Sequence, residues 1–162
     1  MGFGFWRVKE SLLGPRDVST QACFPPFFDG LKFCVDGSSR GNPGSAGIGG
    51  VLRCVSGKIL GLFSSHIGFS DALVAESTTI LKACQLCYLS LDLRRKPISI
   101  ISDSKVVVSW VNGDGVVEFE VAIIINEIQS FLDLMNRVSV VYVSRIRNSV
   151  ADFLAKKGSG LQ

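Results

Sequence analysis

The sequence predicts an α/β domain in which helices flank a five-stranded mixed sheet. Three strand-like apolar stretches come first, and segments typical of strands and helices then alternate to the end of the chain. The second and third stretches are separated by Ser56 and Gly57, a two-residue connection typical of an antiparallel hairpin. Three antiparallel strands followed by strand–helix units give a mixed sheet covered by helices.

The chain of 162 residues divides into three expected parts. Residues 1–30 mix Gly, Pro and aromatic residues without a period, and Pro25 followed by Pro26 excludes both a helix and a central strand there. We therefore expect an N-terminal extension or linker, a domain over residues 31–158 and a short tail over residues 159–162.

The first three strands lie close together in the sequence. The stretch LKFCVD begins at Leu31 and ends at Asp36, and residues 37–45 are expected to form a loop because they are rich in Gly, Ser and Asn. The hairpin strands are expected within residues 46–55 and 58–67.

A helix and a buried strand follow the hairpin. Residues 71–90 carry apolar side chains at near-helical spacing, with Ser70 or Asp71 as the N-cap. Residues 97–102, PISIIS, are almost continuously apolar, which indicates a strand that is buried on both faces.

The remaining segments complete the alternation. A short helix capped by Ser102 or Asp103 is expected first, despite its β-branched residues, and then a helix over residues 118–136.

The stretch VSVVYV predicts the last strand. Asn148 or Ser149 is expected to cap a final helix that ends before Gly158.

The composition says more about the cellular compartment of the protein than about its binding partner. A content of 47% hydrophobic residues excludes a disordered chain, and the net charge of +3 allows an anionic partner without requiring one. Five cysteines are an odd number without a disulfide framework, which favours a reducing compartment. The sequence contains neither a signal-peptide pattern nor a long uncharged apolar stretch, so we expect an intracellular protein of the nucleus or cytoplasm that is neither secreted nor bound to a membrane.

Two carboxylates follow neighbouring strands of the expected sheet. If the first strand lies between the hairpin and strand 97–102, right-handed crossovers make these two strands parallel, and Asp36 and Asp103 leave the same end of the pair. Two adjacent carboxylates repel each other unless they share a proton or bind a cation. Hard oxygen ligands suit Mg²⁺ or Mn²⁺.

Two further acids could join this pair. Glu76 lies in an otherwise apolar part of the first helix and could project over the same edge. Asp152 lies in the first turn of the last helix, where the helix dipole favours an anion. Taken singly, each of the four acids could instead be a helix cap, a turn residue or an exposed side chain.

Four motifs in order carry a resemblance to a known family. They are VDGSSRGNPGSAGIGGVLR, AES within a helix, SDSKVVV and RIRNSVADFLAKKG. Together they resemble the ribonuclease H domain of the plant non-LTR retrotransposon-derived type, over roughly residues 31 to 158. The resemblance implies the RNase H-like fold and metal-dependent endonucleolytic hydrolysis of the RNA strand of RNA–DNA hybrids.

The resemblance also implies roles for the four acids. Asp36 would bridge two Mg²⁺ ions, for which Mn²⁺ could substitute; Asp152 would complete the first site, and Glu76 and Asp103 would hold the second. One ion would activate a water and the other would stabilise the departing 3′ oxygen, leaving a 5′ phosphate.

Small and polar residues near the motifs are candidates for substrate binding. Small side chains would let the backbone approach the RNA minor groove and its 2′ hydroxyls, although GNPG taken alone is better explained as a turn before a strand. The candidates are Gly37, Ser38, Gly41, Asn42, Arg145 and Asn148.

Departures from the family pattern support a rival interpretation. Ala72 and Leu73 stand where many relatives carry a polar pair, and Tyr142 replaces a histidine usually assigned to product release, unless it faces the core. The rival is a nucleic-acid-binding remnant that cleaves weakly or not at all. In both cases we expect a monomer with a nucleic-acid partner and no obvious protein partner. Cys84 and Cys87 are better explained as core thiols than as a zinc site.

Overall fold

The computed structural model describes residues 4–6, 30–144 and 149–160. Its centre is a mixed sheet with the strand order β1-β4-β3-β2-β5-β6. The strands are β1 (Gly4–Trp6), β2 (Leu31–Gly41), β3 (Gly44–Arg53), β4 (Ile59–Ser70), β5 (Ile98–Ser102) and β6 (Val138–Tyr142). The helices are α1 (Ala72–Leu89), α2 (Leu91–Arg94), α3 (Lys105–Val111), α4 (Phe119–Leu134) and α5 (Ser149–Ser159).

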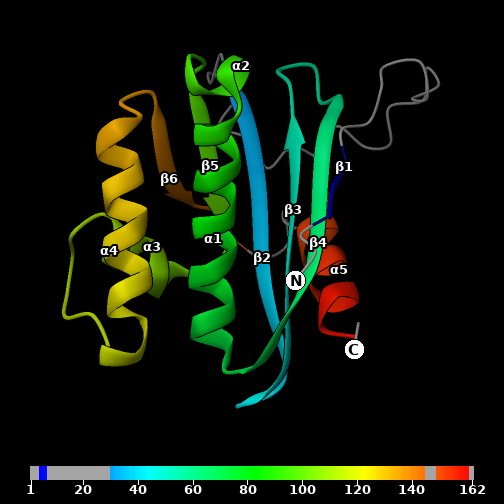
Figure 1. Cartoon of the computed structure of the whole chain (residues 1–162), viewed down its shortest axis with the longest axis vertical. Coiled ribbons are helices and arrows are strands. Elements are labelled where there is room, and N and C mark those ends of the chain that lie inside the picture. Colours follow the sequence, from blue (N-terminus) through cyan, green and yellow to red (C-terminus); the bar gives the residue numbers. More distant parts are fainter. Residues whose placement is uncertain (1–3, 7–29, 145–148, 161–162) are drawn as a thin grey trace.

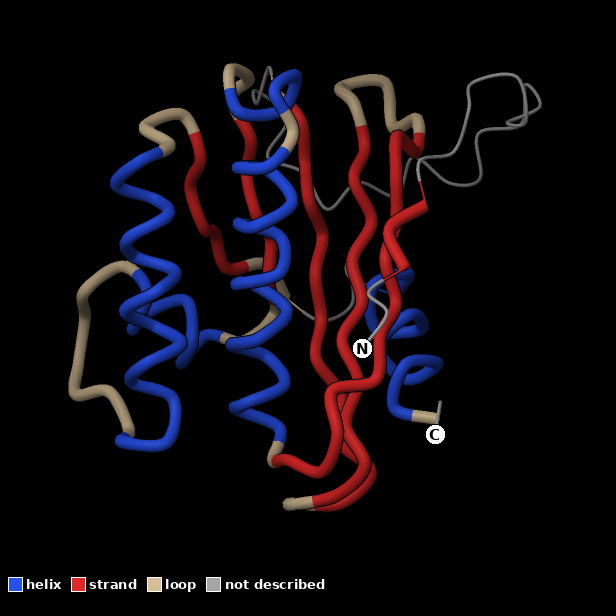
Figure 2. The backbone as a smooth tube through the Cα atoms, viewed as in Figure 1, coloured by secondary structure: helices blue, strands red, loops and turns tan. Residues whose placement is uncertain are grey.

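Helices cover both faces of the sheet. Figure 1 shows α1 and α4 side by side in front of the sheet and α5 behind it. The tube in Figure 2 shows the same three layers, with the long strands of the β2–β3 hairpin reaching past the end of α1. In the described part of the chain, none of the helices is long and apolar enough to span a membrane.

The core lies mainly between the sheet and the α1–α4 layer. Phe33 of β2 and Phe63 of β4 are fully buried and contact each other edge to face, with ring centroids 5.8 Å apart. Aromatic pairs favour this geometry because the positive ring edge meets the negative ring face. Cys84 and Cys87 of α1 are buried within the same cluster, as expected for core thiols.

The predicted fold class is confirmed. The five expected strands are present, β2 lies between β3 and β5, and β2 and β5 run parallel. A short sixth strand was not expected: β1, from the N-terminal extension, pairs with β4 in antiparallel fashion. It covers an edge of β4 that would otherwise leave backbone groups unpaired.

The expected loop over residues 37–45 is wrong. Backbone pairing between β2 and β3 continues to Gly41 and Gly44, so that only Asn42 and Pro43 form the turn. Composition misled the prediction, because the Gly and Ser residues serve packing rather than flexibility. A Cβ on Gly37, for example, would lie 2.2 Å from the backbone carbonyl carbon of Ala75 in α1.

Two element boundaries also differ from expectation. The cap of α3 is Ser104, whose Oγ accepts a hydrogen bond from the Val107 N–H, rather than Ser102 or Asp103. Helix α5 continues through Gly158 to Ser159. Gly158 does not end the helix, because its missing side chain lets α5 contact β4: a Cβ there would lie 2.5 Å from the Ser65 carbonyl oxygen. The short helix α2 was not expected.

Candidate metal centre

Asp36 and Asp103 are placed by the parallel pair of strands. Backbone pairing between β2 and β5 runs from Leu31 to Cys34 on β2, so Asp36 lies just beyond the paired region. Strand β5 ends at Ser102, and Asp103 follows directly. The two carboxylates therefore lie at the same end of the segment in which the two strands pair, as the sequence predicted, although β2 itself continues past Asp36 to Gly41.

The loop after β5 is shaped by two serines. The Ser102 hydroxyl accepts a hydrogen bond from the Ser104 N–H at 3.1 Å, and Ser104 then caps α3. Side-chain-to-backbone bonds of this kind fix local turns. The hydrogen bonds of Ser102 and Ser104 thus fix the backbone on both sides of Asp103. We did not predict this role from the sequence, although the Ser-Asp-Ser motif can be seen there.

Glu76 reaches the same place because α1 lies very close to β2. A Cβ on Gly37 would lie 2.2 Å from the Ala75 carbonyl carbon and 2.4 Å from the Glu76 nitrogen. Only glycine allows this approach, because a real Cβ essentially never comes that near to backbone atoms. Asp71 fixes the start of α1 by accepting a hydrogen bond from the Val74 N–H at 2.8 Å.

Asp36, Glu76 and Asp103 form one cluster. Each offers a carboxylate oxygen, and these three oxygens lie within 4.8 Å of one another. Asp36 is only 1% exposed, and neither of its oxygens accepts a hydrogen bond from a donor in the described part of the chain.

Burial raises the pKa of Asp36 to about 9, and the neighbouring charges of Asp103 and Asp152 add to the increase. Removing a carboxylate from water disfavours its charged form, and a second negative charge nearby has the same effect. A divalent cation would reverse both effects. The donor set also suits such an ion, because hard cations are held by carboxylate oxygens. The cluster therefore fits a divalent metal.

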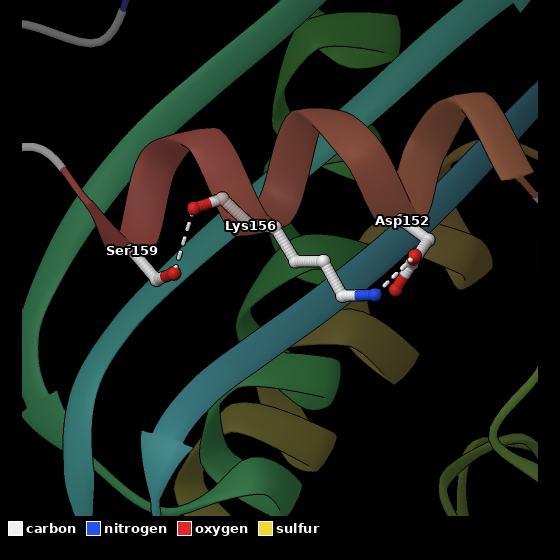
Figure 3. Close-up of polar contacts among 3 residues, drawn as sticks. All are labelled: Asp152, Lys156 and Ser159. Carbon is white, nitrogen blue, oxygen red and sulfur yellow. Dashed lines mark hydrogen bonds and ion pairs between the residues drawn. The ribbon is translucent and has the colours of Figure 1, made fainter.

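Asp152, the fourth predicted acid, is not a member of this cluster. Its carboxylate forms an ion pair with Lys156 of the same helix, with 2.7 Å between Oδ2 and Nζ (Figure 3). The Ser159 hydroxyl donates to the Lys156 carbonyl oxygen at 2.8 Å in the next turn. Asp152 nevertheless lies near enough to Asp36 to raise the pKa of that carboxyl. Sequence reasoning did not anticipate the pair with Lys156, although the spacing of four residues could have indicated it.

Four of the six candidate substrate-binding residues lie in the part of the chain that the structure describes, and their surroundings differ. Gly37 lies beneath α1, and Ser38 is half-buried on β2. The Asn42 side chain accepts a hydrogen bond from the Ala72 N–H at 3.2 Å, which ties the β2–β3 turn to the start of α1. Gly41 enters the turn with φ of +116°, a conformation that favours glycine. Arg145 and Asn148 lie outside the described residues.

Ser39 strengthens the same connection and was not singled out from the sequence. Its hydroxyl bonds to the Ser70 carbonyl oxygen at 2.8 Å, where β4 meets α1. The β2–β3 turn is thus anchored to the helix that carries Glu76. Tyr142 is 45% exposed at the end of β6, so it is not a core aromatic.

Comparisons with known proteins identify the family of the chain. The reverse transcriptase-like family model matches residues 34–158, and the chain belongs to this family. In Arabidopsis thaliana, the protein named "Putative ribonuclease H protein" is 32% identical over 148 residues, which cover 91% of this chain and 23% of that protein. The chain thus spans about a quarter of its curated relative, and the predicted resemblance to the plant retroelement type of ribonuclease H domain is confirmed.

Solved structures agree with this assignment. RNase H1 of Halobacterium salinarum is 26% identical with a TM-score of 0.72, and the match covers 79% of this chain and 96% of that one. LC11-RNase H1, solved in complex with an RNA/DNA hybrid, is 27% identical with a TM-score of 0.72, over 78% of this chain and 94% of that one. The fold is therefore RNase H-like.

Proposed function

We propose that this domain is a divalent-cation-dependent endoribonuclease that hydrolyses the RNA strand of RNA–DNA hybrids. The observation that carries the proposal is the cluster of Asp36, Glu76 and Asp103, in which the Asp36 carboxylate is almost completely buried and accepts no hydrogen bond from the residues that the structure describes. Such an arrangement is costly without a cation, so it is not expected in a purely structural position. The relatives named for ribonuclease H and the complex of LC11-RNase H1 with a hybrid support this choice of substrate.

The residues have distinct parts in the proposed reaction. Asp36 would bridge two Mg²⁺ ions, Asp152 would complete one site, and Glu76 and Asp103 would hold the other. When bound, Mg²⁺ provides the positive charge that makes water more acidic and stabilises the developing charge on the phosphate and the 3′ oxygen. The protein's part is to hold the acids: Gly37 admits α1, and the two serines beside Asp103 fix its loop. The expected products carry a 5′ phosphate and a 3′ hydroxyl.

Recognition of the hybrid is assigned to the β2–β3 turn and the start of α5. Because the Asn42 side chain already binds the α1 backbone, its contribution would come from the backbone of the Gly41–Asn42 turn, which small residues leave accessible to the RNA minor groove. Arg145 and Asn148 remain proposed contacts to the substrate backbone.

The proposal is tested with a panel of labelled duplexes. The purified chain is incubated with an RNA–DNA hybrid labelled on either strand, with double-stranded RNA and with double-stranded DNA, in Mg²⁺ or in EDTA. We expect cleavage of the RNA strand of the hybrid alone, in Mg²⁺ alone, with fragments sensitive to a 5′-phosphate-dependent exonuclease. Cleavage in EDTA or of the DNA strand would contradict the proposal. Hybrid binding without cleavage in Mg²⁺ and in Mn²⁺ would instead support the remnant interpretation.

A further inference from the structure

The solvent-facing side of α4 carries large apolar side chains. Phe119 and Ile123 are 91% and 74% exposed, and Leu134 at the other end of the helix is 66% exposed. At about 100° per residue, these three positions point within about 60° of one another, on the side opposite the buried Val121 and Ile125. Together with Val116, which is 91% exposed just before the helix, they form what we call the outer α4 surface. Figure 1 shows α4 as the outermost helix of its layer.

The chain segment that forms this surface carries charges of one sign, although Arg137 follows shortly after α4 and Arg94 stacks on Tyr88, which contacts Phe131 of α4. Residues 106–136 contain no Lys or Arg, although the chain as a whole carries +3. The same stretch contains five acidic residues, which gives a local charge of −5, and all five are exposed. They are Asp114, Glu118, Glu120, Glu127 and Asp133. The outer α4 surface is therefore apolar side chains within an acidic field.

This combination selects among possible partners. Contiguous exposed apolar side chains surrounded by polar residues are typical of interaction sites. Nucleic acid and anionic lipid both present phosphates, which the acidic field repels. A partner with apolar anchors and positive charge is attracted by both properties of the surface.

We propose that the outer α4 surface docks a positively charged protein segment with apolar anchors, such as a basic amphipathic helix laid along α4. Phe119 and Ile123 are i, i+4 neighbours and supply the apolar contacts at one end of α4, and Leu134 supplies the contact at the other end. The polar Asn126 and Ser130 lie between them on the same side of the helix. The acidic residues on either side set the orientation of the segment and speed its association. This surface is separate from the carboxylate cluster, which is built from β2, α1 and the end of β5.

Synthetic helices provide the probe. A labelled amphipathic peptide of Leu and Lys, about 18 residues long, spans the length of α4. It is titrated into the full chain in saturating Mg²⁺, so that the carboxylate cluster does not compete for the lysines. Two comparison peptides replace either every Leu by Ser or every Lys by Glu. We expect only the Leu–Lys peptide to bind, with an affinity that falls as salt increases.

Surface variants then locate the binding. The double variant Phe119→Ser with Ile123→Ser should weaken binding roughly tenfold or more, as loss of central apolar anchors does. The matched control is Phe69→Ser on β4, a residue that is 75% exposed and lies outside the surface. All three side chains are exposed, so the variants should fold, and circular dichroism checks this.

A second pair tests the charge. Glu120→Lys with Glu127→Lys should also weaken binding of the Leu–Lys peptide and should permit binding of the Leu–Glu peptide. Equal binding to the parent chain and both double variants would overturn the proposal. Self-association of the parent chain that Phe119→Ser with Ile123→Ser abolishes would also overturn it, because a second copy would then be the partner.

Discussion

The backbone of Gly37 passes beneath the backbone of Ala75 with no space for a side chain between them. This contact brings α1 against β2 and sets Glu76 beside Asp36. The metal centre therefore depends on a glycine that offers no ligand.

Gly37→Ala tests this dependence. The added methyl group must push α1 away, which we expect to cost about 1–3 kcal/mol of stability and to weaken Mg²⁺ binding roughly tenfold. Calorimetric titration of Mg²⁺ measures the second effect separately from the first. In a Glu76→Gln background, Gly37→Ala should reduce Mg²⁺ affinity little further, because the displaced ligand is already lost. An additive loss would show that Gly37 does not act through Glu76.

In the proposed site, Lys156 would compete with the cation for Asp152. Removing the ammonium group in Lys156→Met should raise Mg²⁺ affinity by about two- to threefold, which corresponds to about 0.5 kcal/mol, the worth of an exposed i, i+4 ion pair. Lys157→Met removes the same charge from the neighbouring exposed position and is the matched control, because the ion pair of Asp152 is formed with Lys156. The prediction concerns binding in the absence of substrate. If both variants change the affinity equally, only overall charge matters and the pair does not control Asp152.

The buried carboxyl of Asp36 should make the metal-free protein sensitive to pH. Its pKa is raised to about 9 in the folded state and is about 4 in the unfolded state, so the folded state binds the extra proton between these values. The contribution of Asp36 to the free energy of unfolding is therefore greatest below pH 4. This contribution is lost as the pH rises toward 9. By linkage, the loss between pH 5 and pH 8 is up to about 4 kcal/mol.

Thermal melts in EDTA at pH 5 and pH 8 measure this loss. Added Mg²⁺ should recover most of it at pH 8, because the cation favours the charged carboxylate. Asp36→Asn should melt with a much weaker dependence on pH and on Mg²⁺. A parent protein that is equally stable in EDTA at both pH values would argue against a buried, repelled carboxylate.

The sequence predicted the pairing that matters most for the site. The apolar runs of β2 and β5 indicated adjacent parallel strands, and so placed Asp36 and Asp103 at one end of them. The continuation of β2 beyond Asp36 was not predicted, because Gly and Ser residues in that segment have the composition of a loop. In that segment the small size of Gly37 is required by α1, and that requirement is visible only once the helix is in place.

For Glu76 and Asp152 too, the sequence predicted the secondary structure but not the contacts of the side chain. The helical pattern predicted the helix that carries each of them. The close approach that brings Glu76 into the cluster depends on Gly37, and the ion pair of Asp152 depends on the rotamer of Lys156. The approach of Glu76 cannot be read from spacing, because tertiary packing sets it. The spacing of Asp152 and Lys156 permits an ion pair, and the side-chain conformation decides whether it forms.

Single-turnover cleavage by Asp36→Asn tests the central claim most directly. The variant removes one negative charge from the cluster and keeps nearly the same shape, so it should fold at least as well as the parent in EDTA. The parent and the variant are compared on a hybrid labelled on the RNA strand, in Mg²⁺, with enzyme in excess. We expect cleavage by the parent and at least a roughly hundredfold slower rate for the variant. A folded variant that cleaves at the parent's rate would contradict the assignment of this cluster as the catalytic metal centre.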